Sequence, residues 1–121
     1  MGKKILIVDD EPNIVVSLEF LMKQKGYVVK VVDNGEDALT AVAEFGPDLM
    51  LLDVMMPRVS GYDVCQKVRE NPAWAGMRII MLSAKGRSIE VSKGIAVGAD
   101  AYVTKPFSTR DLIGQVARML D

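Results

Sequence analysis

The sequence of 121 residues contains no histidine. Without an imidazole, the chain cannot form the Ser-His-Asp or Cys-His groups of hydrolases, an imidazole zinc site or a histidine pH switch. The single cysteine, Cys65, excludes an intramolecular disulfide and a Cys-X-X-Cys pair. Any chemistry must therefore rest on carboxylates, hydroxyls, lysine ammonium groups or the backbone.

The sequence also lacks a long apolar run and an excess of charge of either sign. The first apolar stretch, residues 5–8, is ended by Asp9 and Asp10 and is too short for a signal peptide or a membrane span. Lys and Arg number 15 against 16 Asp and Glu, a net charge of -1, which disfavours a broad surface for nucleic acid or anionic lipid. We therefore expect a cytoplasmic protein that contacts neither nucleic acid nor a membrane directly.

The length and the apolar content bound the domain organisation. Half of the residues are apolar (50%), which is enough to bury one core without metals or disulfides. A chain of this length leaves no room for a second domain. We expect residues 1–121 to form a single domain.

Apolar and β-branched runs alternate along the chain with segments of helical spacing. Runs that are apolar at every position suit parallel strands buried on both faces of a sheet. The predicted strands are residues 5–8, 28–32, 49–52, 79–82 and 102–104.

Local signals mark where the intervening helices begin and end. Pro12 suits the first turn of the first helix. Asn34 is a typical cap for the second helix, which Gly46 ends, while Ser60 and Ser108 precede the third and fifth helices. These signals place one helix after each of these strands.

The fourth helical segment, residues 88–97, has the weakest pattern. It carries few large apolar side chains, and Gly94 lowers its helix propensity by about 1 kcal/mol. We still predict a helix, because parallel neighbouring strands need a crossover between them. The chain therefore reads as five βα units: an α/β fold with a doubly wound parallel sheet.

Polar side chains follow four of the five predicted strands. In doubly wound sheets, ligands bind beyond the carboxyl ends of the strands, so these residues are the candidate site. They are Asp9, Asp10 and Glu11 after the first strand, Asp53 after the third, Ser83 after the fourth and Lys105 after the fifth.

The chemistry of this set points to phosphoryl transfer. Three carboxylates, Asp9, Asp10 and Asp53, repel one another unless a cation joins them, and their hard oxygens suit Mg²⁺ together with a phosphate. A lysine is a point charge suited to phosphate, and a serine hydroxyl can donate to a phosphoryl oxygen. A carboxylate can be the nucleophile and form an aspartyl phosphate. Phosphoryl transfer needs mainly positioning and charge neutralisation, which this set supplies without histidine.

Four segments carry a resemblance to a known family: ILIVDDE, PDLMLLDVMMPRVSG, IIMLSA and GADAYVTKPF. Over essentially its whole length, the sequence resembles the receiver domain of bacterial response regulators, the phosphoacceptor proteins of two-component signal transduction, and is similar to the chemotaxis receivers. The resemblance implies a flavodoxin-like (βα)5 fold with strand order 2-1-3-4-5.

The resemblance also implies a role for each site residue. Asp53 would accept a phosphoryl group from a phosphohistidine on a sensor histidine kinase or a histidine phosphotransfer protein. Asp10, Asp53 and the backbone carbonyl of Met55 would hold Mg²⁺, and Asp9 would assist through the metal's shell. Lys105 would contact the phosphoryl group, and the peptide that follows it would be cis.

A conformational switch is implied as well. Ser83 would move toward the phosphoryl oxygens, and Tyr102 would turn into the space that Ser83 vacates. This movement would reshape the face made by the fourth helix, the fifth strand and the fifth helix, for a downstream output domain or protein.

Two departures from the family's usual residues carry further predictions. Met55 and Lys85 occupy the positions that tune hydrolysis of the phosphoryl group, and a bulky apolar Met55 beside the site predicts slow self-dephosphorylation. Val91, Ala101 and Gln115 lack the charges that usually join the dimers of winged-helix regulators. We therefore expect a monomer or a weak dimer.

Two other classes of protein remain as alternatives. A Mg²⁺-dependent phosphatase with an aspartyl nucleophile uses a similar set of Asp, Ser and Lys. Such enzymes place a second acid two residues after the nucleophile, where this chain has Met55, and they usually need a cap or a longer core. A structural module that never accepts phosphate would not need the intact set of site residues. We therefore favour a signalling switch over an enzyme that turns over a substrate.

Overall fold

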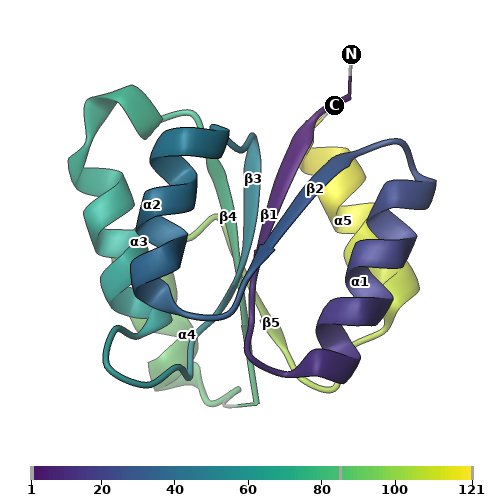
Figure 1. Ribbon diagram of the computed structural model, residues 1–121. Helices are drawn as coiled ribbons and strands as arrows, with labels where there is room; N and C mark the ends of the chain where they lie inside the picture. The colour runs from purple at the N-terminus through teal and green to yellow at the C-terminus, as the bar shows by residue number, and fades with distance from the viewer. Residues whose placement is uncertain (1, 85, 121) are drawn as a thin grey trace.

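The parallel sheet predicted from the apolar runs is present in the computed structural model, which describes residues 2–84 and 86–120. Within these residues, five strands form one parallel sheet in the order β2-β1-β3-β4-β5. Helices α2, α3 and α4 cover one face of the sheet and α1 and α5 cover the other (Figure 1). The doubly wound fold and the strand order are both confirmed.

The strand boundaries agree with the predicted ones to within one residue at either end. The strands are β1 (Lys4–Val8), β2 (Val28–Val32), β3 (Leu49–Asp53), β4 (Arg78–Ser83) and β5 (Ala101–Thr104). The helices are α1 (Pro12–Gln24), α2 (Gly35–Phe45), α3 (Gly61–Glu70), α4 (Ser88–Ala96) and α5 (Thr109–Leu120), with a short 3-10 turn η1 (Pro72–Trp74) that was not predicted. In the part of the chain that the structure describes, no helix is long and apolar enough to cross a membrane.

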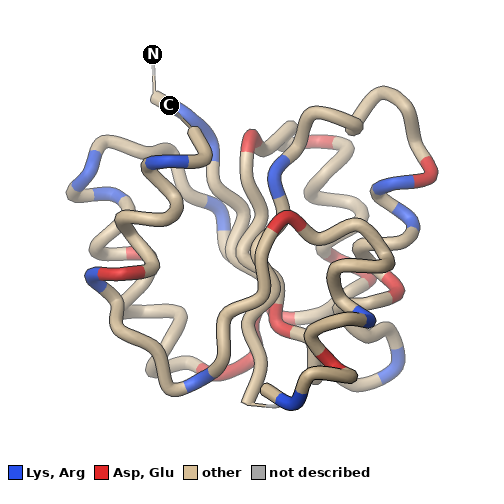
Figure 2. Tube along the Cα trace, turned by 180° about the vertical axis from the view of Figure 1, so that it is seen from behind, with Lys and Arg blue, Asp and Glu red and all other residues tan. Residues whose placement is uncertain are grey.

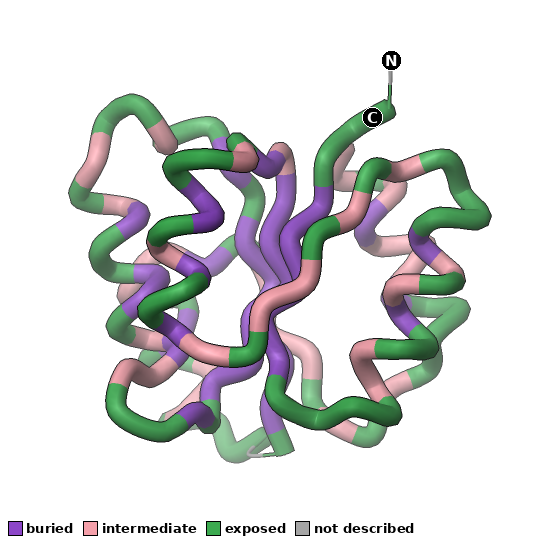
Figure 3. The backbone as a smooth tube through the Cα atoms, in the orientation of Figure 1, coloured by how far each residue is buried: buried purple, intermediate pink, exposed green. Residues whose placement is uncertain are grey.

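Side-chain alternation along the strands divides the core into two apolar clusters. Leu6 and Val8 of β1 pack with residues of α2 and α3, whereas Ile5 and Ile7 pack with residues of α1 and α5. The central strands β1, β3 and β4 are buried along almost their whole length, while the edge strand β2 is partly exposed (Figure 3). Burial on both faces explains why the central strands are apolar at nearly every position.

The predicted helix ends are confirmed by their hydrogen bonds. Asn34 Oδ1 accepts from the N–H of Asp37 at 2.8 Å at the start of α2. Ser60 forms a capping box with Asp63 at the start of α3. Such caps satisfy backbone N–H groups that have no partner inside the helix, and each contributes about 1 kcal/mol.

Helix α4 ends at Ala96, one residue earlier than predicted, and its glycine has a packing role. A Cβ atom on Gly94 would lie 2.8 Å from Cδ2 of Tyr102 and 2.9 Å from the sulfur of Met81, closer than real Cβ atoms come. The missing side chain therefore lets the aromatic ring of β5 pack directly against α4. The residue that weakens the helical pattern is the one that brings Tyr102 and α4 together.

Candidate functional site

Strand register places two acidic side chains next to each other. Val8 of β1 is paired with Leu52 of β3, so the residues that follow them, Asp9 and Asp53, are level with each other and share one side of the sheet. Asp53 is paired with Leu82 of β4. The site is therefore built at the carboxyl ends of the central strands, as the sequence predicts for a doubly wound sheet.

Three carboxylates form a cluster at this edge of the sheet. Asp9, Asp10 and Asp53 each offer an oxygen, and these oxygens lie within 4.8 Å of one another. Asp9 and Asp53 are buried, whereas Asp10 is exposed. Asp53 Oδ1 also accepts from the N–H of Met55 at 3.3 Å. Hard oxygen donors at this spacing, partly shielded from water, fit a small divalent cation such as Mg²⁺.

Lys105 brings a positive charge into the acidic cluster. Its side chain is 9% exposed, and its Nζ lies 3.1 Å from Asp9 Oδ2 and 3.5 Å from Asp53 Oδ1. A third and shorter contact, 2.6 Å, joins Nζ to Glu11 Oε1. Burial lowers the pKa of Lys105, but the contacts with Glu11, Asp9 and Asp53 outweigh it and the pKa is raised. Figure 2, seen from behind, shows acidic and basic positions side by side at the lower edge of the sheet.

One ammonium group does not balance the charge of the cluster. The pKa of Asp53 is raised from 3.8 to about 6, first by burial and then by the negative charge of Asp9, although Lys105 lowers it in part. The ionised carboxylate of Asp53 is therefore disfavoured in the folded protein. A further cation at this edge would relieve the imbalance.

Ser83 lies at the carboxyl end of β4, with its side chain on the other face of the sheet. It ends β4, is fully buried and is paired with Thr104 of β5. Because side chains alternate along a strand, Ser83 shares a face with Met81, which packs in the cluster under α2 and α3. Met81 is paired in turn with Tyr102, so Ser83 and Tyr102 lie on the same face.

Tyr102 is half-buried and joins β5 to α3 and α4. It shares a side-chain hydrogen bond with Tyr62 of α3. The pKa of Tyr62 is raised to about 12, first by burial and then by this hydrogen bond. The hydroxyl of Tyr62 also donates to the backbone carbonyl of Glu90 in α4 at 3.2 Å. Lys93 Nζ lies 4.4 Å from the centre of the Tyr62 ring, a cation–π contact.

Two residues in these contacts were given no role from the sequence. Glu11 follows the same strand as Asp9 and Asp10, and its place as the third consecutive acidic residue was the sequence feature that could have indicated a role. Tyr62 is an aromatic residue in the first turn of α3, a position that gives no sequence clue to a partner in β5. Both contacts depend on segments that are distant along the chain.

The remaining predicted residues lie beside the cluster or outside the description. Met55 contacts Asp53 through its backbone N–H, and the residue is 52% exposed. The peptide between Lys105 and Pro106 is cis. Lys85, the second predicted tuning residue, lies outside the described residues.

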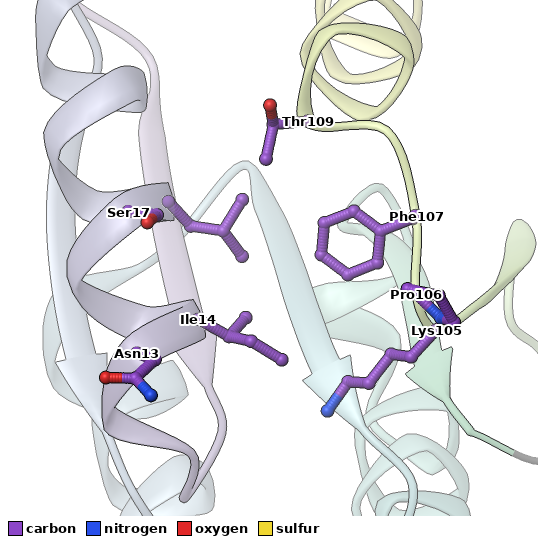
Figure 4. Close-up of a pocket in the computed structure, with 8 residues that line it drawn as sticks. Asn13, Ile14, Ser17, Lys105, Pro106, Phe107 and Thr109 are labelled. Atoms are coloured by element: carbon purple, nitrogen blue, oxygen red, sulfur yellow. The ribbon is translucent and has the colours of Figure 1, made fainter.

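A groove opens next to the cluster, between α1 and the segment that follows β5. Its volume is about 230 Å³, and it is lined by Ile14 and Leu18 of α1 and by residues 105–107 and Thr109. Figure 4 shows Phe107 and Lys105 on one side of the groove and Ile14 and Ser17 of α1 on the other. A partner that approaches Lys105 on this side would meet an apolar surface.

Comparison with known proteins gives a consistent result. The family model described as the response regulator receiver domain matches residues 5–117. The structure is similar to the beryllofluoride-activated receiver domain of DrrB from Thermotoga maritima (37% identity, 99% of this chain and 98% of that chain, TM-score 0.89). It is also similar to a CheY-like receiver domain protein from Methanospirillum hungatei (29% identity, 100% of this chain and 95% of that chain, TM-score 0.93). A third similar structure is the chemotaxis protein CheY4 of Vibrio cholerae (28% identity, 98% of this chain and 99% of that chain, TM-score 0.91).

The raised pKa of Asp53 predicts a pH-dependent stability. The folded protein binds the Asp53 proton more tightly than the unfolded chain does, so ionisation of Asp53 lowers the free energy of unfolding. This loss of stability is absent below about pH 4 and complete above about pH 6. Without a divalent cation, we expect Asp53→Asn to be more stable than the wild type by about 2 kcal/mol at neutral pH, and the difference to vanish as the pH falls through this window. Urea unfolding at a series of pH values measures it.

The matched control is Asp33→Asn, which removes an exposed carboxylate from the loop after β2. We expect this substitution to change the free energy of unfolding by less than about 0.5 kcal/mol at every pH. A stability difference for Asp53→Asn that is constant with pH, or that grows in acid, would contradict the account.

Proposed function

The chain belongs to the response regulator receiver domain family of two-component signalling, and we propose that it is a phosphorylation switch whose phosphoacceptor is Asp53. The observation that carries the proposal is the buried carboxylate of Asp53, whose pKa is raised and which lies among Asp9, Asp10 and Lys105. Such an environment favours reaction with a phosphoryl group that arrives together with a cation.

In the proposed reaction, a carboxylate oxygen of Asp53 attacks the phosphorus of a phosphohistidine. The new oxygen–phosphorus bond forms as the phosphorus–nitrogen bond breaks, and the imidazole leaves and takes up a proton. Because this chain contains no histidine, the donor must be a partner: a sensor histidine kinase or a histidine phosphotransfer protein. The N–H of Met55, which donates to Oδ1 of Asp53, would hold the carboxylate in place for this attack.

Charge on the phosphoryl group is balanced by residues that already surround Asp53. Asp10, Asp53 and the backbone carbonyl of Met55 would hold Mg²⁺, with Asp9 assisting from the metal's shell. When bound, Mg²⁺ supplies positive charge that neutralises the carboxylates and the phosphoryl oxygens. Lys105 would pair with a phosphoryl oxygen on the side of the sheet that faces α1 and α5.

The signal passes, in this proposal, through the opposite face of the sheet. Ser83 would turn its hydroxyl toward the phosphoryl oxygens, and Tyr102 would move into the space that Ser83 leaves. Because Tyr102 packs on Gly94 and shares a hydrogen bond with Tyr62, its movement would loosen the contacts that hold α4. The surface of α4, β5 and α5 would then change for a downstream output domain or protein.

We propose that residues 1–121 form one receiver domain, that it works in the cytoplasm, and that it contacts neither nucleic acid nor a membrane directly. It would act as a monomer or a weak dimer, because Val91, Ala101 and Gln115 offer no charges for a salt-bridged interface. Beyond its own phosphorylation and slow dephosphorylation it would catalyse no reaction. Repeated turnover of a phosphomonoester would instead favour the alternative, a Mg²⁺-dependent phosphatase with Asp53 as its nucleophile.

Phosphorylation by a small donor tests the assignment of Asp53. We expect acetyl phosphate with Mg²⁺ to add one phosphoryl group to the wild type and none to Asp53→Asn, because the amide cannot act as the nucleophile. Intact-mass spectrometry counts the groups. Chelating the metal should abolish labelling, and the control Asp33→Asn should be labelled like the wild type. Equal labelling of the wild type and Asp53→Asn would overturn the assignment.

Met55 predicts how long the phosphoryl group persists. Its backbone N–H contacts Asp53 Oδ1, and we propose that its apolar side chain obstructs the water that hydrolyses the aspartyl phosphate. We expect a half-life of minutes or longer for the wild type, a shorter one for Met55→Asn and an unchanged one for Met55→Leu. Loss of label, followed by mass spectrometry after the donor is removed, measures each. A half-life of seconds in the wild type would refute the tuning role of Met55, which Lys85 is proposed to share.

A further inference from the structure

The shortest contact of the Lys105 ammonium is with a residue outside the carboxylate cluster. Glu11 Oε1 lies 2.6 Å from Nζ, compared with 3.1 Å for Asp9 Oδ2 and 3.5 Å for Asp53 Oδ1. The side chain of Glu11 is 54% exposed, and Glu11 is not among the three carboxylates whose oxygens cluster. Its backbone N–H donates to Asp9 Oδ1 at 2.9 Å, which fixes the start of this side chain at the border of the site.

Lys105 and a divalent cation would compete for the same carboxylates. The ammonium contacts Asp9 and Asp53, two of the three carboxylates whose oxygens lie close enough to hold a metal ion. Two cations on the same pair of carboxylates repel each other strongly at this separation. Binding of a metal must therefore move the ammonium away from Asp9 and Asp53.

Glu11 offers the displaced ammonium a partner. Among the three carboxylates that Lys105 contacts, Glu11 is the one outside the group that could hold the metal. Because the Glu11 side chain is about half exposed, it can move together with the ammonium and stay in contact with solvent. Lys105 then keeps one ion pair and remains at the edge of the site.

We propose that Glu11 is a positioning residue that holds the Lys105 ammonium when a divalent cation binds to Asp9, Asp10 and Asp53. This inference rests on the proposed function and deepens it. With Glu11 present, the metal displaces the ammonium from two carboxylates but not from its closest partner. Glu11 therefore strengthens metal binding and keeps Lys105 available for the phosphoryl group.

Titration of the unphosphorylated protein with Mg²⁺ tests the proposal, with backbone amide chemical shifts as the readout. In Glu11→Gln, Lys105 keeps only Asp9 and Asp53 as charged partners and competes more strongly with the metal. We expect the Kd for Mg²⁺ to rise about fivefold. The control Glu44→Gln removes one exposed carboxylate from α2 and should change the Kd by less than about twofold.

A double-mutant cycle separates this role from a general effect of charge. Lys105→Met removes the competing ammonium, so adding Glu11→Gln in that background should change the Kd by less than about twofold. The conservative variant Glu11→Asp, which keeps the charge on a shorter side chain, should lie between the wild type and Glu11→Gln. The same loss of affinity from Glu11→Gln in both backgrounds, or no loss in either, would overturn the proposal.

The titration also distinguishes failure of this inference from failure of the proposed function. A wild type that binds no Mg²⁺, or one whose binding is unaffected by Asp53→Asn, would remove the proposed metal site itself and with it the role of Glu11. Binding that depends on Asp53 but not on Glu11 would overturn the role of Glu11 alone. Thermal unfolding of each variant checks that the fold is retained.

Discussion

Burial of two carboxylates beside each other is the constraint on which the site depends. The register of β1 and β3 sets Asp9 and Asp53 side by side, and burial keeps water from screening them. The pKa of Asp53, raised to about 6 by burial first and then by Asp9, reflects the free energy stored there. The apolar core on both faces of the sheet is rigid enough to hold the two carboxylates in place. The fold therefore keeps an excess of negative charge at this site, which Lys105 balances in part. A bound metal and a phosphoryl group would change the contacts of Lys105.

Because side chains alternate along the strands, the site residues are divided between the two faces of the sheet. Lys105 and Asp53 meet on the side of α1 and α5, whereas Ser83 and Tyr102 lie on the side of α4. The proposed switch would pass from the charged strand ends of one face to the packing of the other. The close approach of Tyr102 to α4, made possible by Gly94, is the contact that the proposed switch would alter.

Much of this architecture could be predicted because its signals are local. Runs buried on both faces mark the strands, and the polar residues that end those runs mark the site, which is why strand boundaries agree within one residue. The contact of Lys105 with Glu11 spans 94 positions, and that of Tyr62 with the Glu90 carbonyl spans 28. These contacts depend on how loops and helices are placed in space, so no periodicity or spacing announces them. The absence of histidine was also informative, because the phosphohistidine of the proposed reaction must then belong to a partner.

The central claim is that charge added at Asp53 reaches α4 through Ser83 and Tyr102. Beryllofluoride, which mimics the phosphoryl group on an aspartate, tests it most directly when its effect on backbone amide chemical shifts is mapped in the presence of Mg²⁺. The account predicts shifts that extend from the loops after β1 and β3 through β5 to α4, and that are absent in Asp53→Asn. Shifts confined to the loops that border Asp53, with α4 and Tyr102 unchanged, would contradict it.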